Sequence, residues 1–374
     1  MGVYRGKLID LDVHHTWTTQ DEIIERLPPQ WRTIASTVRG SGLPIEGPSN
    51  SSGPPGGGYR GDSEPEVGPP GSSYPLLREQ LLDKHNVDRV ILGFNTGRNN
   101  GLSNPYFGQA VVRAINDWNV DTWLSIDDDR LASVVLIPGQ FIDEAVSEIE
   151  RLAEHPKIVA GLIGWNAFGK PLGSPVYHPI YSALHDSELM LNVHIGAGEY
   201  SNKGGAAMVA SGAPAIYYDF HVLFPQNMMH HLASLLVHRV FDKFPNLKVV
   251  CIEGGVGWLP WLASNLDANY KVLRAEMPSL DRKPSEYLRE HVRLTTQPFE
   301  ASDDPKRVVR ALSTVEGIEE LLCFSTDYPH WDGDNPRYMT NRLPDEWQER
   351  VFFRNADETY RWPARAALTE SVGV

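Results

Sequence analysis

Short apolar runs recur along the chain and alternate with segments of helical pattern. The first run is LIDLDV, at residues 8–13, and seven similar runs follow it. They are VDRVILGFN (87–95), LASVVLIPG (131–139), KIVAGLIGWN (157–166), LMLNVHIG (189–196), LKVVCIEGG (247–255), VRLTTQP (292–298) and LLCFSTDYP (321–329). Runs of this length without polar alternation are typical of parallel strands that are buried on both faces. The pattern therefore predicts eight buried strands.

Amphipathic helices are predicted between these strands. Residues 140–155, QFIDEAVSEIERLAEH, repeat apolar positions with the 3.6-residue period of a helix, and residues 227–244 and 304–315 are similar. A last helix is expected at 355–362, with Asn355 as its N-cap. Eight strand–helix units in 374 residues predict an α/β fold, a single (β/α)8 TIM barrel. A doubly wound open sheet is the alternative, but no G-x-G-x-x-G motif follows an early strand.

A long segment after the first strand fits neither period. Residues 38–75 are rich in Gly, Pro and Ser, which predicts an irregular insertion. It could be a disordered linker, or a lid or partner-binding arm over the end of the first strand. We therefore expect one domain, residues 1–374, interrupted by this insertion.

Composition and charge narrow the class of protein. The net charge of −14 argues against a nucleic-acid partner, which would need a basic surface. Cys251 and Cys323 lie inside apolar runs and are expected to be reduced core residues. The N-terminal stretch MGVYRGKLIDLDV does not resemble a signal peptide, and no apolar run is long enough to span a membrane. We expect a cytoplasmic enzyme that binds neither membrane nor nucleic acid.

Polar residues with metal-binding side chains stand where several strands end. They are Asp12 and His14 on the first strand, His194 on the fifth, Glu253 on the sixth and Asp327 on the eighth. In a barrel, side chains at the carboxyl ends of the strands converge on one mouth. Three carboxylates brought together would repel one another, and a divalent cation removes that repulsion. The alternative is that each residue separately caps a helix or solvates a loop.

Four stretches resemble the amidohydrolase superfamily, and more narrowly the amidohydrolase-related branch that includes aminocarboxymuconate semialdehyde decarboxylase. They are D-V-H (12–14), N-V-H-I-G (192–196), F-P-N-L-K-V-V-C-I-E-G-G-V-G-W-L-P-W-L (244–262) and L-L-C-F-S-T-D-Y-P-H (321–330). The resemblance covers nearly the whole chain outside the Gly/Pro-rich segment. It implies metal ligands at Asp12, His14, His194 and Asp327. Two positions depart from the decarboxylase pattern, because Asp12 and Glu253 stand where those relatives have histidine.

These two departures bear on which metal would bind. An Asp, His, His, Glu, Asp set is rich in carboxylates, which favour harder metals than zinc. The pattern resembles the dinuclear iron or iron/manganese oxygenase members of the branch, such as 2-aminoisobutyrate hydroxylase. We therefore expect two Fe or Mn ions and an O2-dependent hydroxylation of a small organic substrate.

Two other readings stay open. In the first, a single Zn or Mn ion serves a hydrolase or a non-oxidative decarboxylase, with Glu253 as general base. In the second, the chain is a non-catalytic subunit that supports a catalytic partner. In either case we expect a homo- or hetero-oligomer.

Further candidates lie near the expected mouth. His330 follows Asp327 by three residues and is a candidate catalytic residue that contacts the substrate or a metal ligand; its alternative is a structural role in the Tyr-Pro-His turn. His15 is a candidate acid, base or ligand of a second metal if the loop turns it inward, and a packing residue if it continues the strand. Candidate substrate contacts are Trp165, Tyr218, His221 and Gln297.

Overall fold

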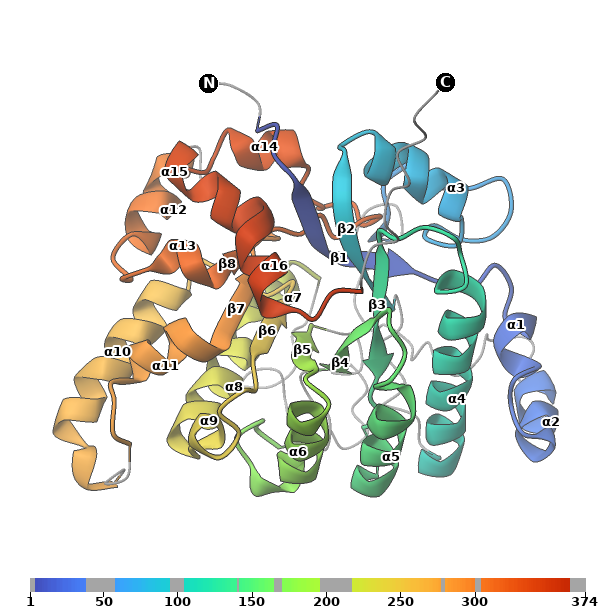
Figure 1. Cartoon of the computed structure of the whole chain (residues 1–374), viewed down its shortest axis with the longest axis horizontal. Helices are drawn as coiled ribbons and strands as arrows, with labels where there is room; N and C mark the ends of the chain where they lie inside the picture. The colour runs from blue at the N-terminus through green and yellow to red at the C-terminus, as the bar shows by residue number, and fades with distance from the viewer. Residues whose placement is uncertain are drawn as a thin grey trace, which may run out of the picture.

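Eight parallel strands pair in chain order in a computed structural model that describes residues 4–37, 58–94, 104–139, 141–164, 170–195, 217–276, 280–299 and 304–363 (Figure 1). The strands are β1 (Leu8–His15), β2 (Val87–Phe94), β3 (Leu131–Leu136), β4 (Ile158–Gly164), β5 (Met190–His194), β6 (Val249–Ile252), β7 (Val292–Thr295) and β8 (Leu322–Cys323). Each lies within one of the eight predicted runs or overlaps it closely. Nearly all of their residues are buried, as expected of strands with neighbours on both faces.

The barrel closes between β1 and the segment that follows β8. The Leu11 amide donates to the Phe324 carbonyl at 3.2 Å, the Asp327 amide to the Asp12 carbonyl at 3.0 Å, and the His14 amide to the Tyr328 carbonyl at 2.7 Å. Because β8 itself spans only two residues, these bonds complete the ring. The fold is the predicted (β/α)8 barrel.

Helices surround the strands and connect them (Figure 1). The α-helices are α1 (Asp21–Ile24), α2 (Pro29–Thr37), α3 (Tyr74–Leu77), α4 (Pro105–Trp118), α5 (Ile142–Leu152), α6 (His178–Asp186), α7 (Tyr217–Leu223), α8 (Pro225–Val237), α9 (Val240–Lys243), α10 (Leu259–Val272), α11 (Pro284–His291), α12 (Pro305–Leu312), α13 (Ile318–Leu321), α14 (Pro336–Thr340), α15 (Asp345–Glu349) and α16 (Asn355–Thr359). Short 3-10 turns lie at Pro175–Tyr177 and Arg274–Glu276, and π-helical turns at Arg78–Asp83, Asn119–Trp123 and Arg350–Arg354.

Two of the helix predictions need correction. The predicted helix 227–244 is divided into α8 and α9, because Arg239 adopts a left-handed conformation with φ of 59°. Asn355 is not an N-cap, since it continues a preceding π-helical turn with helical backbone angles. Its side-chain amide instead donates to the carbonyls of Glu319 and Leu322, which ties α16 to the start of β8.

The described part of the insertion packs on the carboxyl end of the barrel. Residues 38–57 lie outside the described residues, but Tyr59 forms a backbone bridge with His330, and the Thr16 amide donates to the Gly71 carbonyl at 3.1 Å. Gly71 has φ of 86°, and a Cβ there would lie 2.8 Å from the His14 carbonyl oxygen, so the chain needs glycine at this close approach. The end of the insertion thus rests directly on the strand that carries Asp12 and His14.

Two further predictions concern the core and membrane. Cys251 and Cys323 are buried free thiols, as predicted. None of the helices among the described residues is long and apolar enough to cross a membrane.

Asp10 supports the closure of the barrel from below the mouth. Its buried carboxylate accepts from the Thr326 amide at 2.9 Å and from the Thr326 hydroxyl at 2.5 Å. Burial raises the pKa of Asp10 to about 7. The Asp12 amide also donates to this carboxylate, at 3.2 Å, and together with the two bonds from Thr326 it stabilises the charged form.

We expect Thr326→Val to lower the free energy of unfolding by about 1–3 kcal/mol, because it leaves a buried carboxylate oxygen without its hydroxyl donor. Chemical denaturation of the two proteins measures the difference. The matched control is Thr314→Val, whose hydroxyl donates to the Ala311 carbonyl at the surface and whose loss should cost less than about 0.5 kcal/mol. Equal losses for the two variants would contradict the role given to Thr326.

Candidate metal centre

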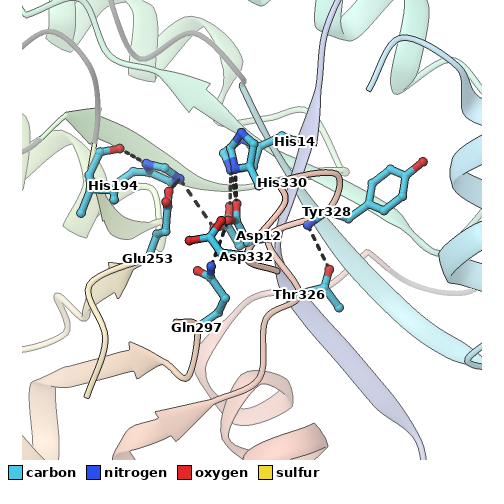
Figure 2. Close-up of polar contacts among 12 residues, drawn as sticks. Asp12, His14, His194, Glu253, Gln297, Thr326, Tyr328, His330 and Asp332 are labelled. Carbon is cyan, nitrogen blue, oxygen red and sulfur yellow. Dashed lines mark hydrogen bonds and ion pairs between the residues drawn. The ribbon is translucent and has the colours of Figure 1, made fainter. Parts of the chain in front are cut away.

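The ends of four strands, or the residues just after them, deliver five polar side chains to one point of the mouth. Asp12 and His14 stand two apart on β1, so the strand pleat points both to the same side. His194 is the last residue of β5, Glu253 follows β6, and Asp327 lies four residues beyond β8. Figure 2 shows Asp12, His14, His194 and Glu253 facing one another. The predicted convergence is therefore present in the fold.

Asp12 lies at the middle of this group. One of its carboxylate oxygens is 3.5 Å from His14 Nε2, and the other is 3.6 Å from His194 Nε2. His194 Nε2 is also 3.4 Å from Glu253 Oε2. One potential ligand atom from each of these four residues lies within 4.8 Å of all the others. Such a spacing suits a single divalent ion held between them.

A second group of donors overlaps the first. It consists of His14, Glu253, Asp327 and His330, again within 4.8 Å of one another. Asp327 Oδ1 lies 2.9 Å from His14 Nε2 and 2.6 Å from His330 Nδ1. His14 and Glu253 belong to both groups. The geometry thus combines Glu253, rather than Asp327, with His194, which differs from the ligand set implied by the resemblance.

Several buried atoms of this centre that could bind a metal make no hydrogen bond among the described residues. They include Asp12 Oδ2, His14 Nε2 and His194 Nε2. Buried polar atoms in proteins are normally satisfied, so each of these needs an explanation, and a bound ion is one. Two imidazoles with carboxylates are a donor set that Mn, Fe and Zn all accept. The residues present therefore fit a divalent metal.

The two aspartates of the centre are driven to opposite charge states. Burial raises the pKa of Asp327 well above its usual value, and the nearby acids Asp12 and Asp332 add to this effect while His14 opposes it. Burial also acts against the charge of Asp12, but His14 and His194 together hold the pKa of that carboxyl below its usual value. The environment thus favours a charged Asp12 beside a protonated Asp327, a split typical of paired catalytic carboxyls.

Two of the candidate residues have unusual backbone conformations. Glu253 has φ of 55° and Asp327 has φ of 57°, in the left-handed region that residues other than glycine seldom adopt. The Glu253 amide donates to the Thr295 hydroxyl at 3.0 Å, which holds the turn in place. Strained positions of this kind cluster at functional sites, and here both turn a carboxylate out of a strand end.

His15 does not join the centre. Its Nδ1 is 2.7 Å from the Gly93 carbonyl and its Nε2 is 2.8 Å from Asn119 Oδ1, and its ring stacks on Trp118. Burial lowers its pKa to about 4. This geometry supports the packing alternative for His15 and gives no support to a role as acid, base or ligand.

The other candidates differ in their distance from the centre. Gln297 is fully buried and donates to Asp327 Oδ2 at 3.0 Å, so it contacts the centre through Asp327. His221, on α7, pairs with Asp332 at 2.9 Å. Tyr218 is 75% exposed on the same helix and does not join the group. Trp165 lies outside the described residues.

Asp332 is a residue of the site that the sequence analysis missed. Figure 2 shows it beside the centre. Its charge contributes to the raised pKa of Asp327, and it links the loop after β8 to His221 of α7. The signal available in the sequence was its place two residues after His330, in the run Y-P-H-W-D. An acid in a surface loop carries no periodicity that would have distinguished it.

Comparison with known proteins places this barrel and its centre in a family. The model of the amidohydrolase family, described as "Amidohydrolase", matches residues 9–362. The chain therefore belongs to the amidohydrolase family, and it is a metal-dependent enzyme of that superfamily. The family expected from the four sequence stretches is thereby confirmed.

The decarboxylases to which the chain is similar share little sequence identity with it. A gamma-resorcylate decarboxylase of Polaromonas sp. (strain JS666) is 22% identical over 296 residues, which cover 75% of this chain and 82% of that protein. The crystal structure of 5-carboxyvanillate decarboxylase from Sphingomonas paucimobilis has a TM-score of 0.65 at 20% identity, covering 95% of this chain and 99% of that one. A dihydroxybenzoic acid decarboxylase from Polaromonas sp. JS666, with bound manganese and the inhibitor 2-nitroresorcinol, has a TM-score of 0.62 at 17% identity, covering 95% and 97%. These likenesses show a shared fold, and none of them supports the expected oxygenase.

We expect His194→Ala to weaken manganese binding by at least about tenfold, since even the outer partners of metal ligands are worth about 10- to 100-fold in affinity. Metal content after dialysis against a series of free manganese concentrations measures the loss. His230→Ala is the matched control, because this histidine is exposed on α8 and should leave metal content unchanged. Full metal loading in the His194 variant would remove that residue from the centre.

Proposed function

We propose that this protein is a divalent-metal-dependent, non-oxidative decarboxylase of a small aromatic carboxylic acid. The observation that carries the proposal is the four-donor group of Asp12, His14, His194 and Glu253 beside the buried Asp327–His330 pair. The distant relatives named above add support, because their names describe decarboxylases of aromatic acids. This is the alternative, rather than the favoured, expectation from the sequence.

The four-donor group would hold the ion. Manganese is the metal bound in the Polaromonas decarboxylase, and two carboxylates with two imidazoles suit it. When bound, the ion supplies Lewis acidity and a fixed positive charge that attracts and orients the oxygens of an anionic substrate. Glu253 then serves as a ligand, instead of the free general base proposed from the sequence.

The reaction needs a proton donor at the mouth. A proton adds to the ring carbon that bears the carboxylate, then the bond between that carbon and the carboxylate breaks. Its electron pair restores the aromatic ring as CO2 leaves. The raised pKa of Asp327 favours one proton held between Asp327 Oδ1 and His330 Nδ1, which are 2.6 Å apart. Gln297, donating to the other Asp327 oxygen, fixes the orientation of that carboxyl.

His330 is the member of this pair that reaches solvent. Its side chain is 20% exposed, whereas that of Asp327 is fully buried. The centroid of its ring lies 4.4 Å from that of His14, and the ring also contacts Tyr59 of the insertion. His330 is therefore suited to pass the proton to substrate and to recover one from water.

A second candidate function is the O2-dependent hydroxylation expected from the sequence. The observation that favours it is the overlap of the two donor groups at His14 and Glu253, because a shared carboxylate can bridge two ions. This reaction would need two ions, one in each donor group: either two iron ions or one iron and one manganese ion. A hydrolase with a single zinc or manganese ion would use the first donor group alone.

We expect the purified protein to bind one manganese ion per chain and to release CO2 from hydroxylated benzoic acids at the same rate with and without O2. Metal analysis, a CO2 assay and an oxygen electrode measure these quantities. Chelation should abolish the activity and added manganese should restore it. Two ions per chain with substrate-dependent O2 uptake would contradict the decarboxylase and support the hydroxylase.

We expect His330→Gln to lower kcat by about 10²- to 10⁴-fold, the range typical for loss of a general acid, while metal content stays at the wild-type value. Steady-state kinetics and metal analysis of the same preparation test both parts. The control is His238→Gln, since that histidine is exposed beyond the end of α8. If metal content falls along with activity, His330 is a ligand of a second ion and the one-ion assignment is wrong.

A further inference from the structure

The described end of the insertion lies directly against the loop that carries His330. Tyr59 and His330 are antiparallel bridge partners. The Arg60 amide donates to the Pro329 carbonyl at 3.0 Å, and the matching bond on the other side of the pair is 3.1 Å long. Tyr59 and His330 are therefore a non-hydrogen-bonded pair, the kind in which two opposite side chains approach each other most closely.

Tyr59 places its ring against the imidazole of His330. The two ring centroids are 5.6 Å apart, with an interplanar angle of 34°. This distance lies in the range in which aromatic rings attract each other. A second ring, that of His14, lies 4.4 Å from His330 (Figure 2). Because His14 is itself one of the proposed metal ligands, Tyr59 is a contact to His330 that comes from outside the centre.

The backbone of His330 is held within its own loop. Its amide donates to the Asp327 carbonyl at 2.8 Å, and its carbonyl accepts from the Gly333 amide at 3.3 Å. A Cβ at Gly333 would lie 2.5 Å from the Thr326 carbonyl oxygen, so this tight fold of the loop needs glycine there. The orientation of the side chain is a separate matter. The hydrogen bond between His330 Nδ1 and Asp327 Oδ1 fixes the position of one ring atom but not the tilt of the ring.

The segment that carries Tyr59 is itself anchored. We call residues 58–63 the strap. The Gln80 side-chain amide donates to the Asp62 carbonyl of the strap at 2.6 Å, and its oxygen accepts from the Tyr328 hydroxyl at 3.0 Å. Gln80 thus joins the strap to the loop after β8. Ser63 is fully buried, and its hydroxyl closes a turn within the strap through a bond of 2.7 Å. The Tyr59 ring is therefore carried by a segment with several fixed contacts.

We propose that Tyr59 is a positioning residue that sets the orientation of the His330 ring. In the decarboxylation proposed above, this is the orientation in which His330 passes a proton to the substrate. A proton donor has to lie within hydrogen-bond reach of the atom that it protonates, and a displacement of about 1 Å can cost about 10²-fold in rate. The effect on the rate rests on the proposed function, whereas the effect on the ring orientation does not.

The first test measures the kinetics of Tyr59 variants. We expect Tyr59→Ala to lower kcat by about 10- to 100-fold, because the His330 ring loses its support, while KM and metal content stay unchanged. The backbone bonds of the strap do not depend on this side chain, so the variant should fold. Tyr59→Phe keeps the ring and should recover the activity. Val67→Ala, which shortens a 70% exposed side chain of the same insertion, is the matched control. An unchanged kcat in Tyr59→Ala, or a Phe variant as slow as the Ala variant, overturns the proposal.

The second test asks whether Tyr59 acts through His330. We expect the double variant Tyr59→Ala/His330→Gln to be no slower than His330→Gln alone, because two residues that act as one unit give non-additive losses. Steady-state kinetics of the two single variants and the double variant measure this coupling. Losses that multiply in the double variant would mean that Tyr59 acts independently of His330, which contradicts the assignment.

The third test is independent of activity. Crystal structures of the manganese-loaded wild type and the Tyr59→Ala variant compare the orientation of the His330 ring. We expect the ring to turn away from Asp327 Oδ1 in the variant, or to occupy two orientations, with the backbone bridge at residue 59 retained. A ring that keeps its wild-type orientation overturns the proposal. A displaced ring, in a protein whose wild type releases no CO2, would contradict the decarboxylase alone and still support the positioning role of Tyr59.

Discussion

The backbone pairing of β1 with the segment after β8 is the constraint on which the centre depends. The Asp327 amide donates to the Asp12 carbonyl, so the bond that closes the barrel also fixes two candidate ligands against each other. Asp10 and Thr326 reinforce this junction one layer below, out of contact with water. The end of the insertion packs on the outer side of the same junction through Tyr59 and Gly71. The bonds that close the barrel therefore also set the relative positions of Asp12 and Asp327.

The two aspartates that this junction brings together differ in their charge state. Two carboxyls in a buried pocket cannot both be charged at low cost, and their neighbours decide which one is. Asp12 lies between two imidazoles, which lower its pKa and keep it charged, whereas burial and the neighbouring acids raise the pKa of Asp327 and keep it protonated. A charged carboxylate is what a cation needs, and a protonated carboxyl is what a proton transfer needs. The chemistry that we propose depends on this difference in charge between Asp12 and Asp327.

The sequence by itself determined the eight strands, the barrel, the family and the five strand-end donors, because each depends on local periodicity or on position along a strand. His15 shows where that reasoning stops, since its direction depends on Gly93, Asn119 and Trp118, which come from other strands and helices.

Only the tertiary structure grouped Glu253 with His194, because their distance depends on the left-handed turn after β6. It alone brought Asp332 to the centre and left Tyr218 in solvent, since loop conformation is set by packing rather than by period. Residues within strands are placed by the regular backbone, whereas residues in loops are placed by what they contact.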